Sequence, residues 1–436
     1  MPRAGIRRSR SSAHQLVPQP VHVGEPVAEA VQRDRHGLLV QHLLDLHAGG
    51  ADDRVHHDRH IRGGPQIDHQ VRIGADDLDA RAHAELEHLG IGVLRGPAAE
   101  GQAIEVAEGV LWMRLPLPMR LDHVNVYALR DDDGWTVVDT GFDSRWSRAV
   151  WQRLLDGPLA GAPVVRVLAT HQHPDHIGLA GWFVAQGAEL LTSRTAWLMA
   201  RMLALDVQER PTPAQVAYWR RAGMPAEMLD RKAAERPWNT ADVVHPLPLG
   251  YTRLRDGDRL RLGGRDWRVW TGNGHAAEHL TLWSASDDLV IGGDQLLPGI
   301  SPNLGVYATE PGANPVQEWL DSCARLAARA HHRHLVLPGH KLPFTGLPAR
   351  LEQLAENHHS ALRRLSGVLA QAPRTAVDCF DVLFRRRIGE GEYGLALAEA
   401  VAHINALAAR GAVRAEGETA SGGILWRGED PVADGA

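Results

Sequence analysis

The stretch Val164-Val-Arg-Val-Leu-Ala-Thr-His171-Gln-His173-Pro-Asp175-His176 joins an apolar, β-branched run to four metal-ligand side chains. The run 164–169 is typical of a buried strand, which we expect to end at Thr170. His171 and His173, at positions i and i+2, project from the same side of the loop. Asp175 and His176 follow on the next turn. Imidazole nitrogen with carboxylate oxygen suits zinc, iron or manganese. The stretch therefore predicts a metal site, with a polar turn of satisfied histidines as the alternative.

Three further motifs place ligand-type side chains where predicted strands end. His275 follows a strand over 267–270, Asp294 follows one over 289–291, and His340 follows one over 334–337. Glycines precede each of the three residues and allow the backbone to approach closely. The carboxyl ends of strands are where layered α/β proteins place their sites. We therefore expect the four motifs to meet at one metal centre.

Short strands and helical stretches alternate from about Ile104 onward. Runs 124–129 and 135–139 flank Asp131-Asp-Asp-Gly134, which predicts a hairpin from its turn chemistry. Helical patterns cover 144–155 and 315–330. This alternation predicts a layered α/β or α+β sandwich.

Composition separates the N-terminal part from the rest of the chain. Residues 1–111 contain no Trp, Phe or Tyr, yet they hold eleven of the 25 histidines. Without aromatic side chains this part has little with which to build a core. We interpret 1–103 as a disordered extension or as translated sequence upstream of the true start, and a metal-buffering histidine tract is the alternative.

Charge, cysteine content and hydropathy exclude several classes of protein. The net charge of -6 argues against a protein built mainly to bind nucleic acid. Two cysteines cannot form a disulfide framework and fit a reducing cytosol. No apolar run approaches the ~20 residues that span a bilayer. We therefore expect a cytoplasmic protein without a membrane segment, and leave open whether it forms a homo-oligomer.

The order of the strand-end motifs resembles the metallo-β-lactamase superfamily over residues 105–346. The resemblance implies an α+β fold, the αββα four-layer sandwich, and two divalent metal ions, with zinc favoured over iron or manganese. It implies ligands of a first metal: His171, His173 and His275. It implies ligands of a second metal: Asp175, His176 and His340. Asp294 would bridge both metals, and Asp139 of Val138-Asp-Thr-Gly141 matches a structural aspartate behind the site.

A hydroxide that bridges two metals would attack an electrophilic carbonyl or phosphorus centre. Asp175 would carry a proton to the leaving group, whereas His279, although a nearby alternative, is expected to stabilise the loop. The ligand set resembles that of hydroxyacylglutathione hydrolases and lactonases, which predicts hydrolysis of an ester, thioester or lactone of a small molecule. The alternative is a metal-dependent phosphodiesterase or RNA endonuclease.

Two further segments bear on the substrate. Residues 194–236 predict two or three helices rich in Trp and Met, either a cap that suits an apolar acyl group or ordinary packing. Tyr307 is a candidate for the same pocket.

Residues 349–430 predict three helices and a strand pair that look like a winged-helix unit, which a subset of the superfamily carries. Ten Arg against eleven acidic residues leave this unit no basic face, so we expect packing or pocket formation rather than nucleic-acid binding.

Overall fold

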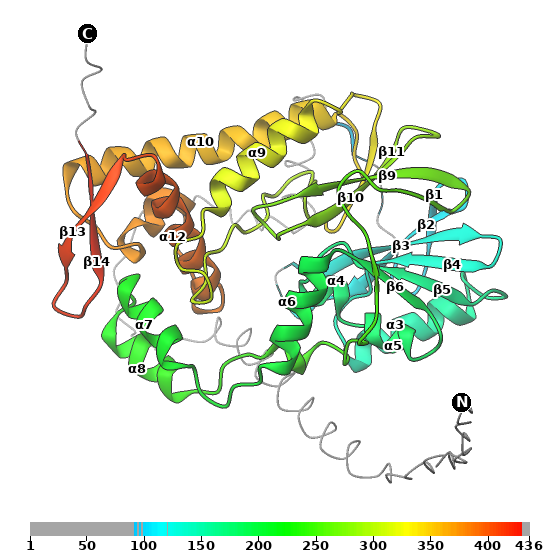
Figure 1. Cartoon of the computed structure of the whole chain (residues 1–436), viewed down its shortest axis with the longest axis horizontal. Helices are drawn as coiled ribbons and strands as arrows, with labels where there is room; N and C mark the ends of the chain where they lie inside the picture. The colour runs from blue at the N-terminus through cyan, green and yellow to red at the C-terminus, as the bar shows by residue number, and fades with distance from the viewer. Residues whose placement is uncertain (1–90, 94–95, 97–98, 120, 430–436) are drawn as a thin grey trace, which may run out of the picture.

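The computed structural model describes residues 91–93, 96, 99–119 and 121–429 (Figure 1). Most of the predicted N-terminal extension, 1–103, lies outside these residues. Three residues of that segment, 91–93, pack into the fold: Ile91 is fully buried, and Val93 forms a β-bridge with Phe344. No helix of the described ranges is both long and apolar enough to cross a membrane.

The first sheet has seven strands that follow one another in chain order. They are β1 (Ile104–Ala107), β2 (Val110–Pro116), β3 (His123–Asp131), β4 (Gly134–Val138), β5 (Val164–Leu168), β6 (Glu189–Thr192) and β7 (Thr252–Arg253). Strands β1 to β4 pair antiparallel and β4 to β7 pair parallel. The predicted hairpin is confirmed, because Asp131 pairs with Gly134 at the turn between β3 and β4.

The second sheet has five strands in the order β12-β11-β10-β9-β8. They are β8 (Arg259–Leu262), β9 (Arg265–Gly272), β10 (His279–Ser284), β11 (Leu289–Gly293) and β12 (Leu335–Pro338). The strands predicted over 267–270, 289–291 and 334–337 all appear here. Only β11 and β12 are parallel, so both of these strands carry their ends to the same edge of the sheet.

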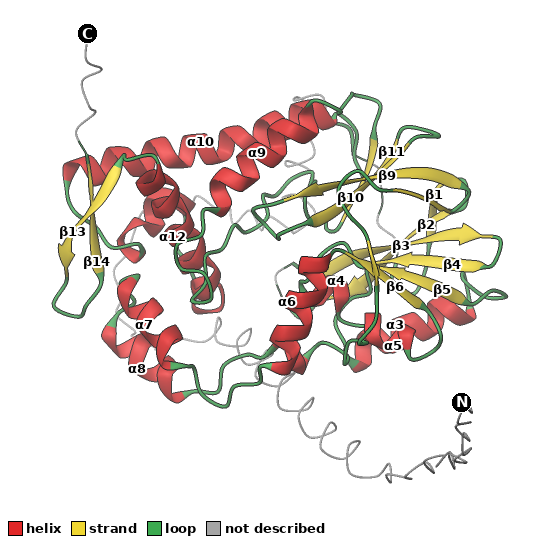
Figure 2. Ribbon diagram, in the orientation of Figure 1, coloured by secondary structure: helices red, strands yellow, loops and turns green. Residues whose placement is uncertain are grey.

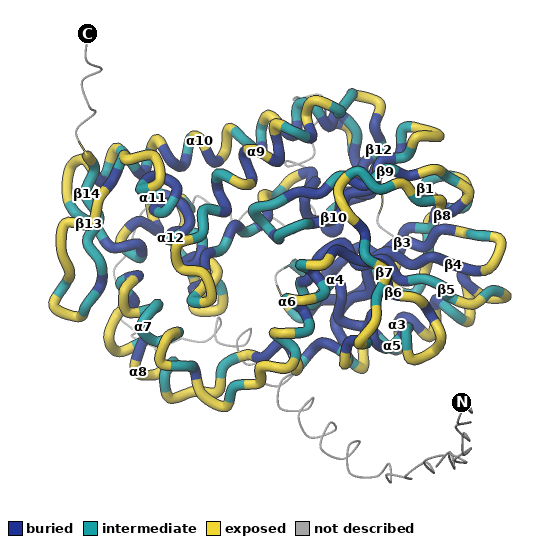
Figure 3. Tube along the Cα trace, in the orientation of Figure 1, coloured by how far each residue is buried: buried dark blue, intermediate teal, exposed yellow. Residues whose placement is uncertain are grey.

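The two sheets face each other across an apolar layer and carry helices on their outer faces (Figure 2). Trp112 and Leu129 of the first sheet pack in one cluster with Trp267 and Leu282 of the second. Outside the first sheet lie α3 (Arg145–Asp156) and α5 (Ala180–Val184), and outside the second lies α9 (Pro315–Ala327). The expected α+β, four-layer sandwich is confirmed. Strands β3, β4 and β10 are buried along most of their length (Figure 3).

The helix predicted over 144–155 illustrates why these layers form. The Ser144 side chain accepts a hydrogen bond from the Ser147 N–H and so caps the first turn of α3. Val150, Trp151 and Leu154 recur at helical spacing and are fully buried against the first sheet. Capping and amphipathic spacing therefore give this segment one stable orientation.

The predicted insertion contains three helices, α6 (Arg194–Leu205), α7 (Pro213–Arg221) and α8 (Ala226–Ala234), followed by η1 (Thr240–Asp242). Its two halves pack differently. Met224 and Leu229 are buried in the cluster that also holds Ala376 and Cys379 of the C-terminal part. Ordinary packing therefore accounts for the apolar residues of α7 and α8. Helix α6 instead leaves apolar side chains exposed.

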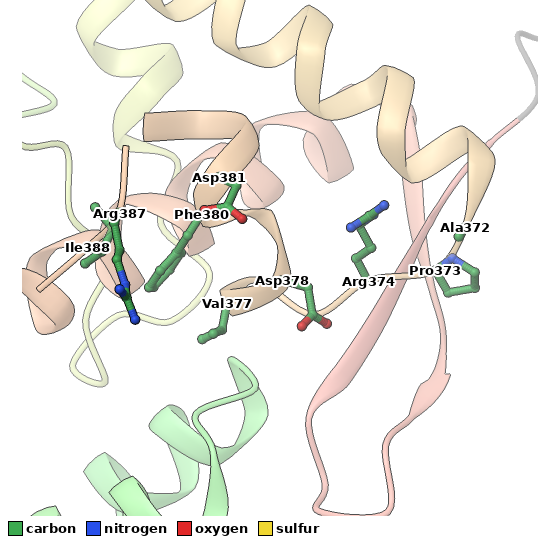
Figure 4. A pocket seen from close by; sticks show the side chains of 9 residues that line it. All are labelled: Ala372, Pro373, Arg374, Val377, Asp378, Phe380, Asp381, Arg387 and Ile388. Carbon is green, nitrogen blue, oxygen red and sulfur yellow. The ribbon is translucent and has the colours of Figure 1, made fainter. Parts of the chain in front are cut away.

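The C-terminal part begins with the long helix α10 (Leu347–Gln371) and contains α12 (Tyr393–Ala409), with η2 (Val377–Cys379), α11 (Phe380–Phe384) and η3 (Glu390–Glu392) between them. It ends in the predicted strand pair, β13 (Val413–Glu418) and β14 (Ile424–Gly428). The second of the three helices predicted within 349–430 is short, because Arg385 adopts the left-handed conformation (φ 54°) and ends α11. An open pocket of 560 Å³, lined by residues such as Arg374 and Phe380, lies in this part (Figure 4). None of its lining residues belongs to the predicted metal centre.

Candidate metal centre

The four motifs each follow a strand, as the sequence predicts. Strand β5 leads to His171, β9 to His275, β11 to Asp294 and β12 to His340. After His173, Pro174 starts the short helix α4 (Pro174–Ile177), because proline is well suited to the first position of a helix. This turn returns the side chains of Asp175 and His176 toward the preceding histidines.

The structure brings all seven predicted ligands together. Ligand atoms within each group lie no more than 4.8 Å from one another in three overlapping sets: His171, His173 and His275; Asp175, His176 and His340; His171, His176 and Asp294. The first two sets coincide with the ligand sets that the family resemblance implies.

Asp294 lies between these two sets. Its Oδ2 is 3.4 Å from His275 Nε2 and 3.3 Å from His340 Nε2, and its Oδ1 is 3.5 Å from His176 Nε2. Neighbouring glycines make room for this carboxylate, since a Cβ at Gly339 would collide with Asp294 Oδ1. One carboxylate group thus faces histidines of both sets.

Asp139 lies directly behind the centre and orients two of its histidines. Its Oδ2 accepts hydrogen bonds from His176 Nδ1 (2.8 Å) and from the Thr170 hydroxyl (2.9 Å). Because the Thr170 hydroxyl donates its proton to Asp139, its oxygen accepts from His171 Nδ1 (3.0 Å). Both imidazoles therefore carry their proton on Nδ1 and leave the Nε2 lone pair for the centre.

The other two histidines that face Asp294 are oriented by backbone carbonyls. His275 Nδ1 donates to the Asn303 carbonyl (2.9 Å), and His340 Nδ1 donates to the His123 carbonyl (2.8 Å). Each again presents Nε2 toward the carboxylate. Fixed tautomers of this kind are typical of metal-bound histidines.

Replacement of Asp139 tests this arrangement. We expect Asp139→Asn to lower metal affinity by roughly 10- to 100-fold, because an amide cannot accept all the hydrogen bonds that Asp139 receives from Thr170 and His176. Competition against a chelator of known affinity measures the change. Asp156→Asn, on the surface at the end of α3, is the matched control. Unchanged affinity in Asp139→Asn would contradict the orienting role.

Three of the polar atoms that face the centre have no hydrogen-bond partner among the described residues. His176 Nε2, His275 Nε2 and Asp294 Oδ1 are buried without a hydrogen bond among the described residues. Buried polar atoms of this kind are costly unless something else satisfies them. A divalent cation satisfies imidazole lone pairs and carboxylate oxygens together, so the donor set fits a metal.

Burial and neighbouring charges shift the pKa values of the ligands in different directions. Burial lowers the pKa of His173 to about 3, with the nearby His275 as a second cause. Burial opposes ionisation of Asp294, but His340 and His176 outweigh it and hold the pKa of Asp294 well below its usual range. Neutral imidazole and ionised carboxylate are the forms that coordinate metals. Burial also opposes protonation of His340, but Asp294 outweighs it and raises the pKa of His340 to about 10, so a metal must displace that proton.

Several residues that support the centre escaped the sequence analysis. The Asn125 side-chain amide donates to the carbonyls of Pro338 (2.9 Å) and Lys341 (2.8 Å), and the Tyr127 hydroxyl donates to Pro338 (2.7 Å). These bonds hold the turn that carries His340. The sequence held one signal for these residues, since Asn125 interrupts the apolar run 124–129. The structure shows that Asn125 is fully buried.

The remaining predicted residues lie around the centre in different ways. His279 is fully buried, stacks on His171 (4.5 Å between ring centroids) and accepts the Asp294 N–H on Nε2 (3.1 Å). This geometry agrees with a loop-stabilising role. Tyr307 is 49% exposed, and its side chain folds back over Gly305. It belongs to none of the three sets of converging ligand atoms.

Comparisons with known proteins agree with this geometry. The model of the metallo-beta-lactamase superfamily matches residues 119–365, more than half of the chain, and a metallo-beta-lactamase-like C-terminal domain matches 362–424. The probable metallo-hydrolase YqjP of Bacillus subtilis (strain 168) is 26% identical over 320 residues, which cover 72% of this chain and 97% of that protein.

Two solved structures are similar along most of their length. A beta-lactamase domain protein from Burkholderia ambifaria is 36% identical with a TM-score of 0.70, over 77% of this chain and 96% of that one. A metallo-beta-lactamase family protein from Thermus thermophilus is 28% identical with a TM-score of 0.62, over 74% of this chain and 100% of that one. The chain therefore belongs to the metallo-beta-lactamase superfamily and is a metallo-hydrolase.

Proposed function

We propose that the chain is a binuclear hydrolase that cleaves an ester, thioester or lactone bond of a small molecule with an apolar acyl group. The observation that carries the binuclear site is the position of Asp294 between two ligand sets, within 3.5 Å of three histidine Nε2 atoms. Two free, buried thiols, Cys323 and Cys379, support the further proposal that the protein works in the reducing cytoplasm.

Each ligand has a proposed role. His171, His173 and His275 would hold one ion, Asp175, His176 and His340 would hold the other, and the Asp294 carboxylate would face both. When bound, two divalent ions, with zinc favoured, supply hydroxide at neutral pH and polarise the substrate oxygen. Asp175 is the most exposed of the carboxylate ligands (18% against 8% for Asp294), so its oxygen can pass a proton to the leaving group.

Helix α6 supports the proposed acyl group. Its N-terminus is held beside the His275 loop, because Glu278 accepts hydrogen bonds from the Thr195 N–H (2.9 Å) and from the Thr195 hydroxyl (2.6 Å). Further along, Leu198, Met202 and Leu205 recur at helical spacing and are 52%, 47% and 69% exposed. An exposed apolar stripe tied to a metal-ligand loop suits contact with an apolar substrate.

The acyl preference can be tested on this stripe. We expect Leu198→Ser with Met202→Ser to lower kcat/KM about 10-fold for a long-chain acyl ester and to leave the acetyl ester unchanged, because only the long chain loses apolar contact. Steady-state kinetics on an acyl-length series measures the effect. Leu249→Ser, at an exposed position outside α6, is the control. An equal loss for both chain lengths would rule out acyl recognition by α6.

The reaction class is tested on one purified sample. Elemental analysis counts the metals, and turnover is assayed on acyl esters, thioesters, lactones and a phosphodiester. We expect about two catalytic metals per chain and acyl cleavage that chelation abolishes. Cleavage of phosphodiester or RNA alone would replace the proposal with a metal-dependent nuclease, and absence of metal and turnover would refute both.

A further inference from the structure

A second group of ligand-type side chains lies in the C-terminal part. It consists of His358 on α10 and of Glu399 and His403 on α12. One ring nitrogen of each histidine and one carboxylate oxygen of Glu399 lie within 4.8 Å of one another. The histidines are 4% and 2% exposed, and Glu399 is partly buried beside them. None of its three residues belongs to the seven-residue centre.

The backbone arranges these side chains as metal ligands. Glu399 and His403 are four residues apart on one helix and therefore share a face. His403 Nδ1 donates to the Glu399 carbonyl (2.8 Å), which leaves His403 Nε2 without a proton. That Nε2 accepts a hydrogen bond from His358 Nδ1 (3.2 Å) on the neighbouring helix, so the two nitrogens lie close enough to bind one ion. His358 Nε2 is buried without a hydrogen-bond partner among the described residues.

The charge of Glu399 is poorly compensated by the protein. Glu399 is partly buried, and the Asn303 side-chain amide donates a hydrogen bond to its carboxylate (2.8 Å). Arg364, a nearby cation, donates instead to Ser360 and to the carbonyls of Val382 and Leu383. A buried carboxylate is stable when ionised only if a cation pairs with it.

The donor types of the group match a zinc site. Two imidazoles with one carboxylate form a ligand set that zinc prefers.

We propose that His358, Glu399 and His403 form a third metal site, separate from the catalytic centre, that binds one divalent cation such as zinc. The cation compensates the buried carboxylate and joins α10 to α12. It also acts on the catalytic side, because the Asn303 side chain donates to Glu399 while the Asn303 carbonyl accepts from His275. The C-terminal part thereby supports the loop that orients a catalytic histidine.

The test compares the zinc content of single variants. Wild-type protein, His358→Gln, Glu399→Gln and His403→Gln are saturated with zinc, desalted and analysed for bound metal. We expect each variant to bind about one zinc ion fewer than the wild type. His359→Gln is the matched control, since His359 is exposed on the same helix beside His358. Wild-type zinc content in folded Glu399→Gln and His403→Gln would overturn the proposal.

A measurement on the unaltered protein covers variants that fail to fold. Crystals of the full chain are soaked in zinc, and anomalous scattering is recorded at the zinc edge. We expect a peak between α10 and α12 at these three side chains. Absence of that peak overturns the third site whatever the catalytic centre holds, so the outcome is distinct from a failure of the proposed hydrolase activity.

Discussion

Asp294→Asn is expected to lower kcat/KM by on the order of 10³-fold or more and to reduce the bound catalytic metal. The carboxylate faces three histidine Nε2 atoms within 3.5 Å, and an amide removes both its charge and one of its two acceptor oxygens. Without a correctly held pair of ions, the pKa of the attacking water returns from about 7 toward its value in bulk water. Steady-state kinetics and elemental analysis on the same preparation measure both effects.

Asp288→Asn is the matched control for this prediction. Asp288 lies six residues earlier, is 43% exposed and pairs with Arg333 on the surface. An exposed ion pair contributes little to stability, so this variant is expected to retain full metal content and activity. If Asp294→Asn matched this control in both measurements, the bridging role of Asp294 would be wrong.

Removal of metal by a chelator is expected to abolish turnover and to lower Tm by on the order of 10 °C. A ligand present at 1,000 times its Kd stabilises the native state by about 4 kcal/mol. Each kcal/mol corresponds to roughly 2–4 °C in a domain of 150–250 residues. Metal-free protein also retains the buried carboxylates of Asp294 and Asp175 beside histidines that must then be protonated to compensate them.

The reversibility of this effect separates metal loss from irreversible damage. Activity and Tm are expected to return when zinc is added in excess of the chelator, and protein given chelator already saturated with zinc should not change. A chelated sample that keeps full turnover and Tm, with its metal shown by elemental analysis to be gone, would remove the basis for metal-dependent catalysis.

The α7–α8 pair and the C-terminal part form one packed unit, which changes the interpretation of the insertion. Met224 and Leu229 are buried together with Ala376 and Cys379, and the Val377 N–H donates to the Ala222 carbonyl (3.1 Å). Substitutions of these apolar residues should therefore affect folding rather than substrate choice. Only α6 keeps exposed apolar residues next to the His275 loop.

Much of the centre was predictable because its signals are local. Apolar runs that end in a ligand-type residue mark both the strand and its functional end, and this holds for β5, β9, β11 and β12. The second of the three helices predicted within 349–430 is short for a local reason that the pattern did not show. Arg385 takes a left-handed conformation there, which non-glycine residues adopt in only a few per cent of cases.

The supporting bonds were not predictable because their partners are far apart in sequence. His340 depends on the His123 carbonyl 217 residues away, and Asn125 reaches Lys341 across 216 residues. Neither contact leaves a periodic pattern. Such pairs are decided by the way the two sheets pack, which is a property of the whole core.

The sequence by itself determined the chemistry of the centre and the strand ends on which it sits, because residue type and short-range periodicity are both local. Tertiary structure alone decided the rest: that Asp294 lies between two ligand sets, that Nε2 is the nitrogen of His171, His176, His275 and His340 that faces the centre, and that α10 and α12 bring His358 to Glu399 and His403. These outcomes depend on hydrogen bonds and packing between distant segments, which form only when the layers close on one another.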